Sequence, residues 1–432
     1  MKYLAVLGRQ PEISIAEIES VLSKSFRLLF SSESYVVFSS DIESIDISRF
    51  GGVIKFAKEL EKKPLDFLAG LPEGKLTLGV SDYSKKALRK TAATEALKLK
   101  KILVRHGRSV RVVENKEAIL STATSLHNGL NGKNERKVEL IKIDENWYQV
   151  IGVQDIDAYA ERDQARPARD AKVGMLPPKL AQILINLCGE LKGGSTVLDP
   201  FCGTGVVLQE ALLMGHRVYG TDISERMVEY SKRNLEWLVD NSKRLFSGPG
   251  PSLPSSRGSG PNSRQQPPKY PKNNLFELQN VTIPKSLEFD IFKTQQDHII
   301  PKYPKNNLFE LSQGDATTFT WRQPIDAVAC EGYLGKPMSQ IPVEIKLKTE
   351  KQECSTMILG FLKNLASQIK TGTPVVVACP AWLREDGKYS RLEILDEIEN
   401  MGYNVNNKSR EGLLYYREGQ IVARDIIILR KN

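Results

Sequence analysis

The chain has 432 residues, of which 41% are hydrophobic and 26% charged, so it can bury substantial cores, and its length suggests about two to three domains. Lysine and arginine total 61 against 52 aspartates and glutamates, and the net charge of +9 favours a polyanionic partner. No run of about 18 apolar residues occurs and no long hydrophobic stretch opens the sequence, so we expect a soluble, cytoplasmic protein without a membrane partner. The five cysteines stand singly and the four histidines lack ligand spacing, which argues against a disulfide framework and a metal site.

Short strands and helices alternate through roughly the first 160 residues. A helix is predicted at 14–22, where Ser14 precedes an apolar stripe. Strands are predicted at 2–8, 75–83, 137–143 and 145–155. This alternation is typical of α+β modules, and the polar, proline-bearing segment 161–180 then predicts a connector.

A strongly basic segment runs from Lys85 to Arg111 and contains a single acid, Glu95. Its alanines and leucines recur with helical spacing over 87–103, which predicts an amphipathic helix with a basic face. A solvated surface is the ordinary interpretation, but charge this one-sided favours contacts with phosphates. The candidate RNA contacts are Lys85, Lys86, Arg89, Lys90, Lys98, Lys101 and Arg105. Arg162, Arg166 and Arg169 of the connector could also contact RNA phosphates, with ordinary solvation as the alternative.

From about residue 181 the pattern becomes regular strand–helix alternation, which predicts a parallel, doubly wound sheet. Helices are predicted at 180–191, 206–215, 224–238, 354–369 and 391–402, and strands at 195–199, 217–222, 325–330 and 374–379. An antiparallel hairpin at 411–431 closes the chain, which is a departure from the order of dinucleotide-binding sheets.

The alternation is interrupted at 246–300, where proline, glycine and serine predict a disordered insertion. The segment PKYPKNNLFEL occurs at 268–278 and again, letter for letter, at 301–311. Only the second copy leads directly into SQGDAT, so we expect Leu308–Leu311 to lie in the sheet.

The stretch VLDPFCGTG, Val197–Gly205, carries the strongest chemical signal. A strand that ends in Asp199 and a glycine turn that opens a helix place a carboxylate and backbone N–H groups at the sheet edge where such sheets bind ligands. Gly203 and Gly205 allow close approach to the backbone. The next strand ends in Asp222, which suits two ribose hydroxyls or, alternatively, caps the following helix. Together these residues favour a ligand that contains adenosine.

DPFCGTG resembles the cofactor motif of S-adenosylmethionine-dependent methyltransferases that modify exocyclic amines of bases, and GDAT at 314–317 is similar to their third-strand motif. The segment 166–187 is similar to the one that precedes the catalytic domain in tRNA guanine-10 N2-methyltransferases. The N-terminal half resembles their ferredoxin-like and THUMP modules, so the resemblance covers nearly the whole chain outside 246–300.

The resemblance implies an α/β chain with a ferredoxin-like module at 1–60, a THUMP-like RNA-binding module at 61–160, a linker at 161–180 and a Rossmann-like methyltransferase domain at 181–432. It implies S-adenosylmethionine as cofactor and tRNA as partner. Some relatives act with a small activator subunit; otherwise we expect a monomer. The cofactor-binding residues would be Asp199, Pro200, Cys202, Gly203, Thr204, Gly205, Asp222, Ile223, Asp315 and Ala316.

Related enzymes carry a catalytic loop of the form Asp/Asn-Pro-Pro-Tyr after the fourth strand, and Cys330, Glu331, Gly332 and Tyr333 take these four places. Tyr333 would stack on the base. Cys330 stands where a strong acceptor is expected, so Glu331 would serve as a displaced acceptor if the loop bends at Gly332. Methylation of guanine N2 in tRNA is the favoured reaction. An N6-adenine methyltransferase and a non-catalytic tRNA-binding protein are the alternatives.

Overall fold

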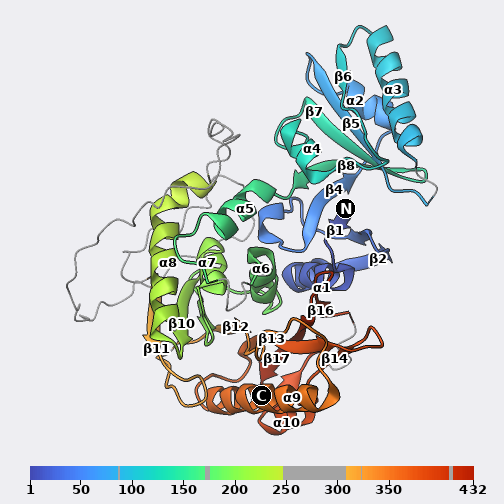
Figure 1. Cartoon of the computed structure of the whole chain (residues 1–432). Coiled ribbons are helices and arrows are strands. Elements are labelled where there is room, and N and C mark those ends of the chain that lie inside the picture. Colours follow the sequence, from blue (N-terminus) through green and yellow to red (C-terminus); the bar gives the residue numbers. More distant parts are fainter. Residues whose placement is uncertain (86–87, 171–175, 247–307, 323, 408–411) are drawn as a thin grey trace, which may run out of the picture.

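The computed structural model describes residues 1–85, 88–170, 176–246, 308–322, 324–407 and 412–432, and every structural statement below refers to these residues. They form two large sheets, one in each half of the chain (Figure 1). Within the described part, no helix combines the length and apolarity that a membrane span requires. All five cysteines are buried and unbridged.

The first sheet has eight strands in the order β2-β3-β1-β4-β8-β7-β5-β6. Its elements are β1 Lys2–Leu7, α1 Pro11–Leu22, β2 Arg27–Ser31, β3 Tyr35–Ser39, β4 Val53–Glu59, α2 Pro64–Ala69, β5 Leu76–Asp82, α3 Arg89–Arg105, β6 Val110–Val112, α4 Thr122–His127, β7 Lys137–Ile143 and β8 Asn146–Val153. The predicted strands are all confirmed. The first helix begins earlier than predicted, because Pro11 suits the first helical position, and Ser14 lies inside the helix with its Oγ bonded to Gln10 O.

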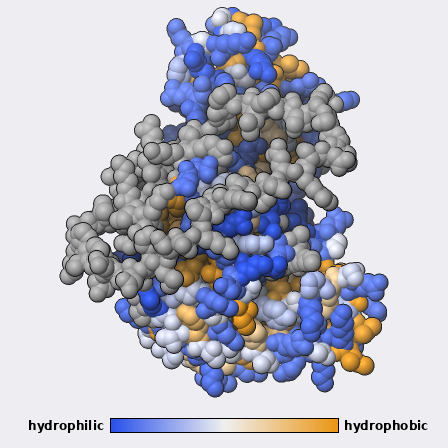
Figure 2. Space-filling view, turned by 60° about the vertical axis from the view of Figure 1, so that its left-hand side comes forward, coloured by the Kyte–Doolittle hydropathy of each residue, from blue (hydrophilic) through white to orange (hydrophobic). Residues whose placement is uncertain are grey.

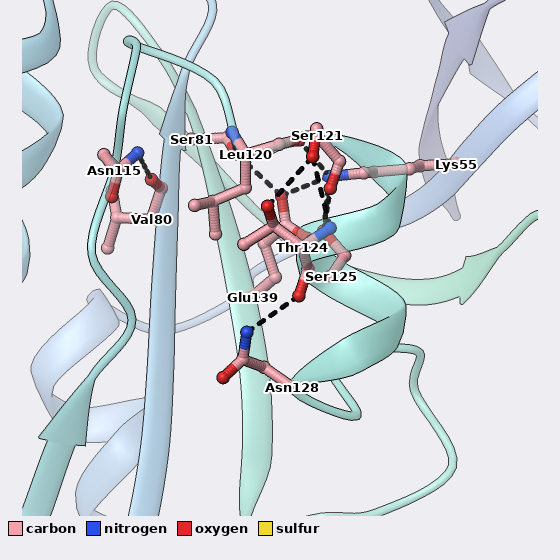
Figure 3. A network of polar contacts seen from close by, with 10 residues as sticks. All are labelled: Lys55, Val80, Ser81, Asn115, Leu120, Ser121, Thr124, Ser125, Asn128 and Glu139. Carbon is pink, nitrogen blue, oxygen red and sulfur yellow. Dashed lines mark hydrogen bonds and ion pairs between the residues drawn. The ribbon is translucent and has the colours of Figure 1, made fainter. Parts of the chain in front are cut away.

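The two modules expected at 1–60 and 61–160 share this sheet, since β4 pairs antiparallel with β8. A buried polar network also joins them (Figure 3). Lys55 of β4 donates to Glu139 Oε1 at 2.6 Å, to Leu120 O at 2.9 Å and to Ser125 Oγ at 2.9 Å. Ser81 donates to the same Glu139 oxygen at 2.7 Å. Because every partner is buried, the network links β4, β5, β7 and α4 into one unit.

Helix α3 confirms the predicted amphipathic helix. Ala92, Ala96, Leu99 and Leu103 recur on one face and are buried against β5 and β6, as the spacing of the apolar residues requires. The opposite face is left to solvent and carries the basic side chains.

The second sheet is ordered β11-β10-β9-β12-β13-β17-β15, with β14 paired to β13 and β16 paired to β17. Its elements are α5 Ile156–Gln164, α6 Pro178–Asn186, β9 Thr196–Asp199, α7 Val206–Leu213, β10 Arg217–Asp222, α8 Glu225–Phe246, β11 Phe309–Gln313, β12 Ala327–Glu331, α9 Glu344–Ala366, β13 Pro374–Leu383, β14 Tyr389–Ser390, α10 Leu395–Asn400, β15 Tyr403–Val405, β16 Leu414–Tyr415 and β17 Val422–Lys431. Strands β9 to β13 are parallel, which confirms a mostly parallel sheet. The predicted hairpin is asymmetric, because β16 is short and β17 lies between β13 and β15 rather than at the edge.

Helices cover both faces of this sheet. Apolar residues of α6, α7 and α8 form one core with β9, and those of α9 and α10 form another on the opposite face. Figure 1 shows α6 and α7 on one side of the strands and α9 and α10 on the other. The carboxyl ends of the parallel strands stay uncovered by this packing, which leaves one edge available for a site.

Strand β11 confirms the expectation for Leu308–Leu311. Phe309 pairs with Val218 of β10, and buried Leu308 accepts a hydrogen bond from Val218 N at 3.1 Å. The first copy of the duplicated segment, and the insertion beyond Phe246, lie outside the described residues.

The two halves meet through α6. Gln182 Nε2 donates to Ser48 O at 2.7 Å, and Asn186 Nδ2 donates to Glu17 Oε1 at 2.7 Å. Gly51 packs so closely that an added Cβ would lie 2.2 Å from Lys179 O. The connector expected at 161–180 is therefore helical at both ends, and its α6 end is bonded to the first half. Such contacts hold the two sheets in a defined relation.

Candidate active site

A cavity of about 510 Å³ opens at the carboxyl ends of β9, β10 and β12, where parallel sheets of this kind bind ligands. Most of the residues expected from the sequence line it. They are Asp199, Pro200, Cys202, Gly203, Thr204, Asp222, Ile223, Asp315, Ala316, Glu331, Gly332 and Tyr333. Gly205 and Cys330 do not line the cavity.

The turn between β9 and α7 contains two glycines, Gly203 and Gly205, which are required for different structural reasons. Both have positive φ, 50° at Gly203 and 81° at Gly205, a region that side-chain-bearing residues rarely adopt. At Gly205 an added Cβ would lie 2.9 Å from Ser231 Oγ, so this glycine permits close packing on α8. At Gly203 the nearest atom to an added Cβ would be 4.0 Å away, so its missing side chain leaves room in the cavity.

Polar side chains of α8 hold this turn in place. Ser231 Oγ donates to Gly203 O at 2.8 Å, and Asn234 Nδ2 donates to Thr204 O at 2.8 Å. Ser231 also contacts the Cys202 thiol, which is buried and serves packing. The sequence offered no signal for Ser231 or Asn234, because polar residues on a helix are ordinarily solvated.

Asp222 accepts backbone hydrogen bonds on both of its oxygens, from Gly203 N at 3.0 Å and from Ser224 N at 2.9 Å. The bond to Ser224 matches the capping alternative, and the bond to Gly203 ties the carboxylate to the glycine turn. A carboxylate has about four acceptor sites, so Asp222 retains capacity toward hydroxyls in the cavity.

Four carboxyl groups line the cavity, those of Asp199, Asp222, Asp315 and Glu331, and Lys336 is the one basic side chain among its described lining residues. Burial, reinforced by Asp222 and Glu331, raises the pKa of Asp199 well above its usual value. Hydrogen bonds from the Thr317 amide and hydroxyl lower the pKa of Asp315. This field suits a ligand that carries positive charge.

The catalytic-loop candidate Glu331 is the last residue of β12 and forms an ion pair with Arg424 of β17. Arg424 Nε donates to Glu331 Oε1 at 2.8 Å, and the two side chains are 8% and 18% exposed. Among the described residues, the oxygen that accepts from Arg424 is Oε1, and Glu331 lines the cavity. Arg424 lies 93 positions from Glu331 in the chain, so no local pattern could have indicated the pair.

The structure corrects the place assigned to Cys330. Its side chain is fully buried in the core with Leu198 and Ile358, and burial raises the pKa of the thiol well above its usual value. The physical reason is the alternation along β12, which directs adjacent side chains to opposite faces. Glu331 reaches the cavity, and Cys330 consequently does not.

Beyond β12 the loop 332–337 forms one wall of the cavity. Tyr333 is half-buried and packs against the core that includes α9. Gly335 has a φ of 79°, and an added Cβ would lie 2.8 Å from Glu350 Oε2, which also accepts from Lys336 N at 3.2 Å. Helix α9 thus holds this loop. Phe201 and Gly314, which belong to the quoted motifs, also line the cavity. Lining residues that the sequence did not indicate are Leu176, Val206, Val207, Leu334, Gly335, Lys336, Pro337 and Met357.

The candidate RNA contacts divide into two groups. Lys85, Lys90, Lys98, Lys101 and Arg105 are exposed, whereas Lys86 and the side chain of Arg89 lie outside the described part. Figure 2 shows the end of the molecule that carries α3, at the top of the view, covered mostly by hydrophilic residues with a few hydrophobic ones among them.

Two arginines of the connector are not exposed contacts, which corrects the prediction for Arg166. The Arg166 side chain is buried and contacts Asp163 at 3.4 Å. Arg162 is buried as well and pairs with Glu210 at 2.8 Å. Both guanidinium groups form ion pairs with carboxylates of the protein. Of the three connector arginines, Arg169 alone is exposed.

Reversal of the exposed charges on α3 tests the remaining candidates. We expect K98E/K101E/R105E to weaken tRNA binding and to reduce the slope of log K against log salt by about 2 to 3, because each phosphate contact contributes ~0.7–0.9. The measurement is a salt titration of tRNA affinity, with the melting temperature as the control for folding. A slope equal to that of the wild type would mean that the basic face of α3 is an ordinary solvated surface that does not contact phosphates.

The parallel sheet with antiparallel β17, the glycine turn and the acids at the strand ends define a Rossmann-like methyltransferase. A family model described as RMKL-like, methyltransferase domain matches residues 166–244. The tRNA (guanine(10)-N2)-dimethyltransferase of Pyrococcus abyssi is 30% identical over 246 residues, which cover 55% of this chain and 68% of that one. The chain belongs to the family of tRNA (guanine(10)-N2)-dimethyltransferases.

Two further similarities are partial or distant. The enzyme of the same name from Methanothermobacter thermautotrophicus is 51% identical over 76 residues, and this match spans only 17% of the present chain and 22% of that relative. The crystal structure of TrmN from Thermus thermophilus aligns over the whole of both chains with 13% identity and a TM-score of 0.44.

Proposed function

We propose that this chain transfers a methyl group from S-adenosylmethionine to the exocyclic N2 of a guanine in tRNA. The observation that carries the proposal is that Glu331 and Tyr333 line the same cavity as Gly203 and Asp222. The cavity therefore combines a hydrogen-bond acceptor for an amine, Glu331, and an aromatic ring, Tyr333, with a turn suited to a nucleoside. Family membership supports guanine over adenine.

The residues present fit the proposed cofactor. Gly203 leaves space at the turn, Asp222 retains acceptor capacity for ribose hydroxyls, and Asp315, two residues beyond β11, lines the same cavity and could contact the adenine. The acidic lining is compatible with a cationic sulfonium and an amino group. When bound, the cofactor supplies an electrophilic methyl group.

The amine of guanine is a poor nucleophile, because its lone pair is delocalised into the ring. We infer that Glu331 Oε2 accepts an N–H hydrogen bond as positive charge develops on nitrogen, while Tyr333 stacks on the base. Positioning then requires the nitrogen at roughly 3–3.5 Å from the methyl carbon. A base in structured RNA has to leave its stack to reach such a cavity.

A non-catalytic tRNA-binding protein remains the second candidate, and one observation favours it. Cys330 takes the place of the strong acceptor of the related loops, and its side chain is buried and does not line the cavity. A protein of this kind would bind the cofactor and tRNA without turnover.

Tritium transfer from labelled S-adenosylmethionine to unmodified tRNA, followed by nucleoside analysis, tests the proposal. Label in N2-methylguanosine supports it, whereas label in N6-methyladenosine would redirect it to adenine. No transfer by the purified chain, with cofactor and tRNA both bound, would favour the second candidate unless an added activator subunit restores transfer. We infer that the chain acts as a monomer, and sedimentation under assay conditions measures this.

The cofactor assignment has its own test. We expect D222A to weaken S-adenosylmethionine binding by roughly 10- to 100-fold, because hydrogen bonds to a charged group contribute about 1.5–3 kcal/mol, and to leave tRNA affinity unchanged. D326A is the matched control, since Asp326 also accepts a backbone hydrogen bond, from Thr196 N at 2.8 Å, but at the opposite end of β9. Calorimetry measures the affinity of both variants for S-adenosylmethionine. Equal affinities would remove Asp222 from the site.

A further inference from the structure

A second hollow, of about 550 Å³, lies between the two halves of the molecule. Its walls come from the loop after β1, the loop at 51–52, α5, the start of α6 and the chain around β16. Figure 1 places β16 beside α1, and Gln10 Nε2 donates to Tyr416 O at 2.6 Å across this junction. We refer to this hollow as the junction groove.

Cations from separate elements converge on the junction groove. Arg9 and Arg417 line it and are exposed, and within the described part of the chain neither guanidinium has a carboxylate partner. Lys179, at the start of α6, donates to Gln154 Oε1 at 2.6 Å. Partial burial of Lys179 and the nearby positive charge of Arg162 lower the pKa of the lysine. Asp163 is the one carboxylate among the described residues that line the groove, and it already contacts Arg166. Among the described residues, no carboxylate pairs with Arg9 or Arg417, so the groove carries net positive charge there.

The junction groove adjoins the active-site cavity. Leu176 lines the cavity, and the next residues, Pro177 and Pro178, line the groove. Consecutive Cα atoms lie ~3.8 Å apart, so the two hollows flank one short segment. On the other side, Tyr415 of β16 lines the groove and is the strand partner of Arg424 in β17. Arg424 in turn forms the ion pair with Glu331. A polymer strand with one residue in the cavity would have its neighbouring residues within reach of the groove.

We propose that the junction groove binds the sugar-phosphate backbone of the RNA strand next to the target nucleotide, with Arg9, Lys179 and Arg417 contacting phosphates. The identity of that strand as tRNA rests on the proposed function. Guanidinium groups match phosphate oxygens in a bidentate manner, and such contacts fix the register of the nucleic acid without reading its sequence. The groove would thereby align the strand so that one base enters the cavity.

Charge reversal at Arg9 and Arg417 tests the groove. We expect R9E/R417E to weaken tRNA binding on the order of tenfold or more at 0.1 M salt and to lower the salt slope by about 1.4 to 1.8. Cofactor affinity should stay at the wild-type value. K363E/K370E is the matched control, because both lysines are exposed, lie outside both hollows and receive the same change in charge.

The outcomes separate this inference from the proposed function. Loss of affinity and slope in R9E/R417E, but not in the control, supports the groove even if no methyl transfer is found. Wild-type affinity and slope in R9E/R417E overturn the groove even if methyl transfer to guanine N2 is demonstrated. Both arginines are exposed and have no carboxylate partner in the described part of the chain, so a folding defect is not expected, and the melting temperature verifies this.

Discussion

Replacement of Glu331 by glutamine is expected to reduce methyl transfer by about 10²–10³-fold while cofactor affinity changes by less than about twofold. Glutamine keeps the shape of the side chain and one acceptor oxygen. It loses the negative charge that would stabilise the developing ammonium and the 2.8 Å ion pair that orients the group toward Arg424. Single-turnover methylation of tRNA and calorimetry of cofactor binding measure the two quantities.

E393Q is the matched control for E331Q. Glu393 forms an ion pair of the same length, 2.8 Å, with Lys351, but its side chain is 88% exposed. Exposed pairs contribute little, so this variant should turn over at the wild-type rate. If E331Q also turned over at that rate, Glu331 would have no part in the reaction, and the ion pair with Arg424 would be structural.

Replacement of Lys55 by methionine is expected to lower the free energy of unfolding by about 3–5 kcal/mol, because it leaves the charge of Glu139 buried without its counter-ion. Both side chains are essentially inaccessible, at 1% and 0% exposure. Ser81 and Ser125 still donate to Glu139, but neutral hydroxyls do not replace an ammonium. Urea denaturation followed by circular dichroism measures the change.

K351M provides the comparison for K55M, since Lys351 pairs with the exposed Glu393. Its cost should stay below about 1 kcal/mol. The double variant K55M/E139L should regain part of the stability lost in K55M, because removing both charges removes the desolvation penalty. A loss of less than about 1 kcal/mol in K55M would mean that water or a rearrangement compensates Glu139, and that the network shown in Figure 3 contributes little.

The proposed cofactor side of the cavity was predictable because its residues are close in sequence to the elements that place them. Asp199 and Asp222 end adjacent parallel strands, and the carboxyl ends of such strands meet at one edge. Gly203 sits in the turn that follows directly. Hydrophobic periodicity located the strands and helices, and the end of each strand then located the acid, so no long-range information was required.

The proposed catalytic side of the cavity and the burial of the connector arginines depended on contacts that periodicity does not encode. The exposed-looking connector arginines Arg162 and Arg166 are buried, since α5 packs near Glu210 of α7. Cys330 and Glu331 could be assigned to opposite faces from the alternation of a strand. Which of the two faces the cavity was decided by the packing of β12 between β9 and β13 and against α9.

The sequence by itself therefore determined the parallel sheet, the glycine turn, the acids at the strand ends and the basic face of α3, because each follows from residues within one or two neighbouring elements. Only the tertiary structure decided the partner of Glu331, the joining of the two halves through α6 and the junction groove with Arg9 and Arg417. These features bring together residues from distant parts of the chain. Their proximity results from the packing of whole sheets and helices, which no local pattern specifies.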